Sequence, residues 1–180
     1  MRILLEDTVA VCVDMQEKFT GIIYKFDKVL QNSKILIDGL NVLEVPIIVT
    51  EQYPKGLGYT IPEIKEHLTE YKPIEKLAFS CCGSDEFCKI LKKTGKKNVI
   101  VFGIETHVCV MQTVLALIEM GYQPVLIEDC VSSRKKSDRK TALNRLQQEG
   151  AIISSYESIL FELSRVAGTE KFKQISKLVK

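Results

Sequence analysis

The sequence has no long apolar run and little excess of charge of either sign. Its longest uninterrupted apolar stretches reach about six residues, whereas a membrane-spanning helix needs roughly 20. The 180 residues include 25 Lys and Arg against 23 Asp and Glu, a formal net charge of +2. Proteins that neutralise many phosphates usually carry a strongly basic face. We therefore expect neither a membrane nor a nucleic acid as partner.

The sequence has six cysteines and only two histidines. Six cysteines are few for a disulfide framework in a chain of this length. The N-terminal MRILLEDT lacks the apolar core and cleavage site of a secretory signal peptide. We expect reduced thiols and a cytoplasmic protein, and an organellar location stays open.

Metal and nucleotide motifs are missing as well. Cys81, Cys82 and Cys88 form no Cys-x-x-Cys pair and have no histidine at ligand spacing, so no zinc site is expected. The Gly-Leu-Gly at Gly56 lacks the third glycine of a dinucleotide fingerprint, and no Gly-Lys-Ser/Thr follows a glycine loop. The sequence thus predicts no metal and no cofactor.

Short runs rich in Val and Ile alternate with segments of helical periodicity. The runs are apolar at consecutive positions, which fits strands buried on both faces; they span residues 8–14, 45–51, 98–103, 124–129 and 151–156, with a weaker candidate at 74–79. Alternating strands and helices predict a parallel sheet covered on both faces. We expect an α/β fold, a three-layer α/β/α sandwich with a central, mainly parallel six-stranded sheet, Rossmann-like, in a single domain over residues 1–180.

Glycines mark the ends of the expected helices. Gly95, Gly121 and Gly150 each follow a helical segment and precede a strand, as C-terminal caps do. Residues 158–180 fit one or two closing helices with Leu160, Leu163 and Val166 among the inward side chains. The long connection over residues 50–84 has one clear helical candidate, and connections of this length tend to be functional.

Asp14 and Cys109 are the first candidates for chemistry, because each lies where an expected strand ends. Ligands of such sheets bind beyond the carboxyl ends of the strands. Asp14 could equally cap the next turn. Cys109 could be a small buried hydrophobe, or, with Thr106 as N-cap, a third helical residue whose pKa the helix dipole lowers.

Lys76 is the candidate that could activate the thiol, since a nearby lysine lowers a cysteine pKa, although most lysines are simply solvated. A Cys-His pair would need His67 or His107 to turn toward Cys109 and is disfavoured. Cys12 and Cys130 fit core positions. The basic run over residues 134–140 fits a solvated helix start.

Three motifs in order resemble those of the isochorismatase-like cysteine hydrolases, over essentially the whole chain. DMQEKF from Asp14 is similar to the family's D-x-Q-x-x-F, KLAFS from Lys76 to K-x-x-F-S, and GIETHVCV around Cys109 to G-x-x-T-x-x-C-V. The resemblance implies that Asp14, Lys76 and Cys109 form a catalytic triad. It also implies a non-proline cis peptide before Glu105.

The resemblance implies further site residues and an assembly. Backbone N–H groups of Glu105 and Cys109 would form an oxyanion hole, and Gln16, Phe19 and Tyr53 would bind a small-molecule substrate. The subgroup most similar, named for an isochorismatase domain, carries TEQYPKGLG, here residues 50–58. The metal-binding histidines of nicotinamidases have no counterpart in that segment. Family members are commonly oligomers, so a homo-oligomer is expected.

These features together predict a hydrolase that cleaves a small amide through a cysteine thioester. Two other classes stay open: a catalytically silent member that acts as a binding or scaffold module, and a redox sensor that uses Cys81 and Cys82. The sequence does not identify the substrate.

Overall fold

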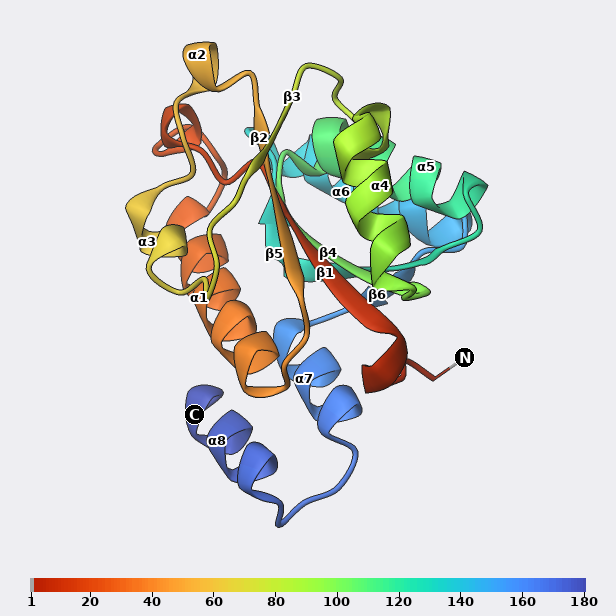
Figure 1. Cartoon of the computed structure of the whole chain (residues 1–180). Coiled ribbons are helices and arrows are strands. Elements are labelled where there is room, and N and C mark those ends of the chain that lie inside the picture. The colour runs from red at the N-terminus through yellow and green to blue at the C-terminus, as the bar shows by residue number, and fades with distance from the viewer. Residues whose placement is uncertain (1) are drawn as a thin grey trace.

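Six parallel strands form one twisted sheet in the computed structural model, which describes residues 2–180 (Figure 1). The strand order is β3-β2-β1-β4-β5-β6. All five pairings between neighbours are parallel. The strands are β1 (Thr8–Val13), β2 (Ile47–Gln52), β3 (Ile74–Lys76), β4 (Asn98–Ile104), β5 (Gln123–Ser132) and β6 (Ile152–Ser154). The expected six-stranded parallel sheet is confirmed.

Helices cover both faces of this sheet, as a buried parallel sheet requires. One layer contains α1 (Phe26–Val42), α3 (Pro62–Lys65), α7 (Tyr156–Ser164) and α8 (Glu170–Leu178). The other contains α4 (Asp85–Thr94), α5 (Met111–Glu119) and α6 (Lys136–Gln148). Each layer packs on its own cluster of buried apolar side chains. The expected α/β/α sandwich is therefore the observed one.

The central strands are apolar throughout because both of their faces are covered. Every residue of β1 and of β4 is buried. Val9 and Val11 face the cluster under α4 and α5, while Ala10 and Cys12 face the cluster under α1. Consecutive apolar residues thus serve two cores at once, which explains why the strands lack an alternating pattern.

Helix ends agree with the glycine pattern, and one core expectation fails. Gly95, Gly121 and Gly150 all have positive φ, the conformation that terminates a helix without a Cβ penalty. Val166, expected to point inward, is 61% exposed because it lies in the turn between α7 and α8. Leu160 and Leu163 are buried as expected.

The connection after β2 holds more structure than its sequence predicts. It contains α2 (Pro54–Leu57) and α3 before edge strand β3, and the short 3-10 turn Cys81–Gly83 follows. In Figure 1 α2 lies beyond the carboxyl end of β2, α3 lies beside α1, and β3 returns along β2. In the part of the chain that the structure describes, no helix has the length and apolarity needed to cross a membrane.

Candidate active site

Asp14, Lys76 and Cys109 meet at the carboxyl ends of three strands. Asp14 directly follows β1 and adopts a left-handed backbone conformation with φ 49°. Lys76 is the last residue of edge strand β3, and Cys109 lies in the turn after β4. Their exposed fractions are only 0%, 4% and 5%. The site is thus a nearly closed polar cluster within an apolar surrounding.

The Asp14 carboxylate has a partner on each oxygen. Lys76 Nζ donates to Asp14 Oδ2 at 2.8 Å, and Thr50 Oγ1 donates to Asp14 Oδ1 at 2.7 Å. The strand register explains the second contact, because Val13 pairs with Thr50 across β1 and β2. These two donors satisfy a carboxylate that has left water, which is the condition for burying a charge.

Lys76 is held in place by further acceptors. Its Nζ also donates to Gln52 Oε1 at 2.8 Å and to the carbonyl of Phe79 at 3.0 Å. Burial lowers the pKa of the Lys76 ammonium, but the Asp14 carboxylate and the sulfurs of nearby cysteines raise it more, so the net pKa is above the ordinary value. Lys76 is therefore a fixed positive charge at neutral pH.

Cys109 lies in a five-residue π-turn, Thr106–Val110, that joins β4 to α5. The expectation of a regular first helical turn with Thr106 as N-cap is wrong. Glu105 precedes the turn without a side-chain cap, and the Thr106 hydroxyl is buried without a partner among residues 2–180. The wider turn still places Cys109 at the head of α5, and Thr113 Oγ1 donates to its carbonyl at 2.7 Å.

The pKa of the Cys109 thiol is raised rather than lowered. Burial is the largest cause, and the Asp14 charge and a side-chain hydrogen bond with Asp14 add to it, while the Lys76 charge acts in the lowering direction. The sequence-based expectation of a depressed pKa is thus wrong in direction. At neutral pH the Cys109 thiol is therefore protonated and lies near the Lys76 ammonium.

Glu105 is tied to the loop after β5. The peptide between Ile104 and Glu105 is cis, as the family resemblance implies. Glu105 Oε2 accepts from the backbone N–H and from Nε of Arg134, at 3.0 and 3.1 Å. This pair fixes the residue that precedes the π-turn, while an oxyanion role for its N–H stays a prediction.

The three expected substrate contacts differ in their surroundings. Gln16 is fully buried, and its Nε2 donates to the carbonyls of Gln52 and Gly58 at 3.0 and 2.6 Å. Gln16 therefore holds two loop segments together, and contact with substrate would require one bond to be exchanged. Phe19 packs half-buried against the α1-side core. Tyr53 is 50% exposed and lines a pocket of about 380 Å³ that reaches Lys76.

Sequence reasoning missed the residues that support the cluster. Thr50 and Gln52 contact Asp14 and Lys76, and Thr113 bridges the Cys81 N–H and the Cys109 carbonyl. They are polar residues within otherwise apolar segments, a signal that becomes readable only once the strand register is known. Both histidines have other partners: His67 Nδ1 contacts Asp38 at 2.6 Å, and His107 Nδ1 contacts Ser133 at 2.9 Å.

Within residues 2–180 no group of three or more His, Cys, Asp or Glu side chains is placed to hold a metal ion. Glu51, the one carboxylate of the 50–59 segment, is buried. Its Oε1 accepts from the N–H and hydroxyl of Thr60, both at 2.7 Å, and from Tyr71. That carboxylate therefore braces the connection after β2.

Comparison with known proteins identifies the family. A profile of the isochorismatase domain matches residues 8–158. This chain belongs to the isochorismatase family. Isochorismatase family protein 1B of Dictyostelium discoideum is 41% identical over 184 residues, covering 99% of this chain and 89% of that protein. Several other relatives are named isochorismatase domain-containing protein, which assigns the chain to that subgroup.

Solved structures of isochorismatase-fold proteins superpose closely. A structure from Caenorhabditis elegans named MAR1 ribonuclease has a TM-score of 0.93 and 42% identity, with coverage of 99% of this chain and 92% of that one. YcaC from Pseudomonas aeruginosa, described with covalent acrylamide, has a TM-score of 0.91 and 26% identity, with coverage of 98% and 91%. YcaC from Escherichia coli, described as an octameric hydrolase of unknown specificity, has a TM-score of 0.91 and 25% identity, with coverage of 99% and 90%. The family and fold support a hydrolase-like function.

Proposed function

We propose that this protein is a cysteine hydrolase that cleaves a small amide, with Cys109 as nucleophile, Asp14 as general base and Lys76 as the charge that orients Asp14. The observation that carries the proposal is the Asp14 carboxylate, which accepts from the Lys76 ammonium at 2.8 Å and raises the pKa of the Cys109 thiol in a nearly closed site. A nucleophile beside a base that a third group orients is the arrangement of nucleophilic catalysis.

Because the thiol is protonated at rest, proton transfer accompanies attack. Cys109 Sγ bonds to the amide carbon while its proton passes to Asp14, which Lys76 and Thr50 hold in place. The oxyanion is stabilised by backbone N–H groups of Glu105 and Cys109, each worth roughly 3 kcal/mol where such donors have been removed. The intermediate collapses, Asp14 protonates the leaving amine, and a thioester remains.

Water completes the reaction through the same carboxylate. Asp14 takes a proton from the attacking water, the carbon–sulfur bond breaks, and the carboxylic acid leaves as Cys109 regains its proton. No step requires a metal or cofactor, so we propose metal-independent turnover. The nearly closed cluster favours a small substrate, which enters beside Tyr53 and Phe19. Covalent acrylamide in YcaC of Pseudomonas aeruginosa gives this proposal support from a relative at 26% identity.

A substrate screen tests the proposal directly. Small amides are incubated with wild type and with Cys109→Ala, and ammonia or amine release is measured with and without a chelator. We expect release by wild type only, unaffected by the chelator. Cys88→Ala is the matched control, because Cys88 is a half-buried cysteine on α4, outside the cluster. Release by Cys109→Ala would contradict the nucleophile, and loss with the chelator would contradict metal independence.

The name of the Caenorhabditis elegans relative makes ribonuclease activity the second candidate. The same screen therefore includes a single-stranded RNA. Cleavage that Cys109→Ala retains would place that activity outside the cysteine site.

We propose that residues 1–180 act as one hydrolase domain and form a cytoplasmic homo-oligomer. Support comes from a single sheet built by strands from 8 to 154, and from the octameric description of YcaC from Escherichia coli. Four large apolar side chains around the site are each at least half exposed, and a second subunit could cover them. They are Tyr53, Tyr59, Leu77 and Phe79. A monomer in light scattering at micromolar concentration would contradict the assembly.

A further inference from the structure

A pocket between the first turns of α1 and α6 is lined by basic side chains that the proposed hydrolysis does not use. Its volume is about 250 Å³. Its lining comes from the start of α1, the end of β5 and the start of α6: Tyr24, Lys25, Lys28, Val29, Asp129, Val131, Ser132, Lys136 and Arg139. None of Asp14, Lys76 and Cys109 belongs to that lining. The pocket is thus separate from the cysteine cluster.

The pocket has an excess of positive charge. Four cationic side chains, Lys25, Lys28, Lys136 and Arg139, face one carboxylate, Asp129. None of the four forms an ion pair with an acidic side chain in the described residues 2–180. Like charges gathered without counter-ions raise the local potential and attract an anion.

Asp129 offsets one of the four positive charges at most. Its Oδ1 accepts the backbone N–H of Tyr156 at 2.9 Å, so the carboxylate is already used to fix the start of α7. Burial raises its pKa above the ordinary value. Since none of the four cations is paired with Asp129 in residues 2–180, three positive charges remain in excess for an outside ligand.

The wall of the pocket is held rigidly before any ligand binds. Arg139 Nε donates to the carbonyl of Val131 at 3.0 Å, and its Nη2 donates to the carbonyl of Glu128. Ser132 Oγ donates to the carbonyl of Tyr24 at 2.7 Å. The guanidinium plane is therefore fixed, and its remaining N–H groups form no hydrogen bond within the described residues 2–180. Ordering this side chain on binding consequently costs little.

We propose that this pocket binds the phosphate group of a small molecule. A phosphate dianion is attracted by an excess of three positive charges, four cations against one carboxylate. Arginine and lysine are both common phosphate ligands in proteins. A volume of about 250 Å³ accommodates one phosphoryl group and a small attached part, and lies below the range of larger cofactor sites.

Titration calorimetry at low salt tests the proposal with inorganic phosphate and with glycerol phosphate as probes, and with glycerol as the uncharged comparison. We expect both phosphates to bind the wild type and glycerol not to bind. Lys28→Gln with Lys136→Gln should weaken phosphate binding at least about tenfold, because two charge-assisted contacts are lost. Lys28 and Lys136 are exposed and form no side-chain hydrogen bond or ion pair within residues 2–180, so the double variant should fold. Arg139→Gln is avoided because it would remove hydrogen bonds to β5.

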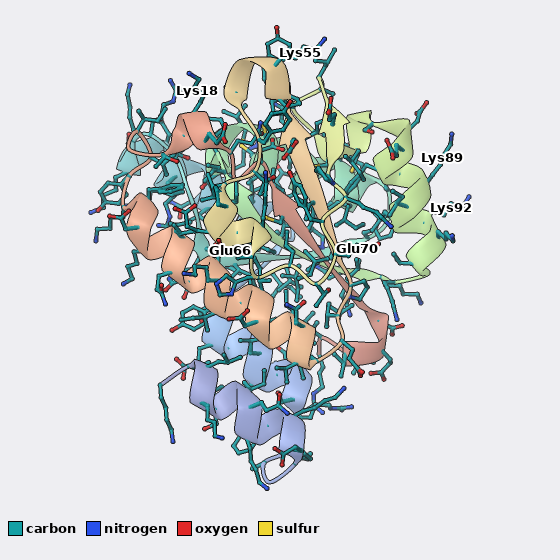
Figure 2. All side chains as sticks on the ribbon, turned by 60° about the vertical axis from the view of Figure 1, so that its left-hand side comes forward. Lys18, Lys55, Glu66, Glu70, Lys89 and Lys92 are labelled. Atoms are coloured by element: carbon teal, nitrogen blue, oxygen red, sulfur yellow. The ribbon has the colours of Figure 1, made fainter. Side chains whose placement is uncertain are left out.

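The matched control is Lys89→Gln with Lys92→Gln, two lysines that project from α4 (Figure 2). The control removes the same net charge elsewhere and should bind phosphate as the wild type does. Equal weakening by the control would show that the effect comes from net charge alone and would overturn the proposed phosphate site. Absence of phosphate binding to the wild type would overturn it as well. An RNA oligonucleotide that binds more tightly than glycerol phosphate and loses affinity in the pocket variant would overturn the small-molecule assignment. Amide hydrolysis in the pocket variant reports separately on the proposed function.

Discussion

At the scale of single residues, the cluster depends on charges that balance one another in a dry environment. Asp14 and Lys76 are both almost fully buried, and each supplies the counter-charge of the other. Removal of one partner from a buried pair costs about 3–5 kcal/mol, because the remaining charge is left without compensation. The pKa of the Cys109 thiol depends on the same balance, since the two charges act on it in opposite directions.

Asp14→Asn is therefore expected to separate thiol ionisation from turnover. Asparagine removes both the charge and the hydrogen bond by which Asp14 raises the pKa of Cys109, while Lys76 still lowers it. We expect iodoacetamide labelling of Cys109 to shift to lower pH and hydrolysis to fall to background. Labelling rate against pH, followed by peptide mass spectrometry, measures the shift. Glu75→Gln on the same edge strand is the control, and an unshifted profile in Asp14→Asn would refute the coupling.

Thr50 is expected to act as a positioning residue, because its hydroxyl is the second donor to Asp14. Thr50→Val keeps the shape and removes one hydrogen bond that favours the charged carboxylate. We expect kcat/KM to fall about tenfold, the loss of roughly 1.4 kcal/mol, because the carboxylate loses one of its two orienting donors. Thr50→Ser keeps the hydroxyl and should restore kcat/KM. Equal losses in Thr50→Val and Thr50→Ser would assign Thr50 a packing role only.

At the scale of elements, the close approach of β1 and β4 sets where Asp14 lies. Gly103 has φ 117°, and a Cβ added there would lie 2.1 Å from the carbonyl oxygen of Val13. Val13 immediately precedes Asp14. Only glycine permits the two strands to stay paired up to the point where β1 delivers its carboxylate.

Gly103→Ala should consequently destabilise the fold by about 3 kcal/mol or more, through strain in both φ and the strand contact. Gly121→Ala is the matched control, because Gly121 has φ 81° but no heavy atom within 4 Å of the added carbon. The control should cost about 1 kcal/mol. Urea unfolding of the two variants measures the difference, and equal losses would contradict the contact.

The strands and helix caps could be predicted from the sequence, whereas the turn at Cys109 could not. Buried strands were predictable because consecutive Val and Ile residues fit a sheet covered on both faces. The glycine caps were predictable because glycine readily adopts the positive φ at which helices end. The π-turn at Cys109 was not predictable, because its extra residue leaves no local sequence signal. Thr50 needed the register with Val13, which is a long-range property of the sheet. The three motif residues were recognisable by resemblance, whereas the raised thiol pKa follows from burial that only the structure reveals.

At the scale of the whole molecule, thiol burial links stability to alkaline pH. Burial raises the pKa of all six cysteines above the ordinary 9.0, to about 11 for Cys81 and about 12 for Cys82. Above pH 9 the unfolded chain loses thiol protons that the folded chain keeps, so unfolding becomes more favourable. The stabilisation is complete below pH 9 and declines as pH rises toward the folded-state values.

We accordingly expect the urea midpoint of the reduced protein to be constant between pH 7 and 8 and to fall between pH 9 and 10.5. Cys12→Ala with Cys130→Ala removes two buried core thiols and should make that fall shallower, whatever it does to stability at pH 7. A midpoint that stays constant to pH 10.5 would contradict thiol linkage. Excess reductant prevents disulfide formation from imitating the effect.

The seam between β1 and β4 divides the molecule into two contiguous stretches of chain. Residues up to the turn at Gly95 build β3, β2 and β1 with Asp14 and Lys76, and residues from Asn98 onward build β4, β5 and β6 with Cys109. The connecting turn is exposed at Gly95, at the end of the sheet opposite the cluster. A chain cut there would give one fragment with Asp14 and Lys76 and a second with Cys109, and each would expose one apolar strand edge, that of β1 or that of β4. Recovery of the proposed hydrolysis on mixing would therefore report that the two fragments had reassembled through the pairing of β1 with β4.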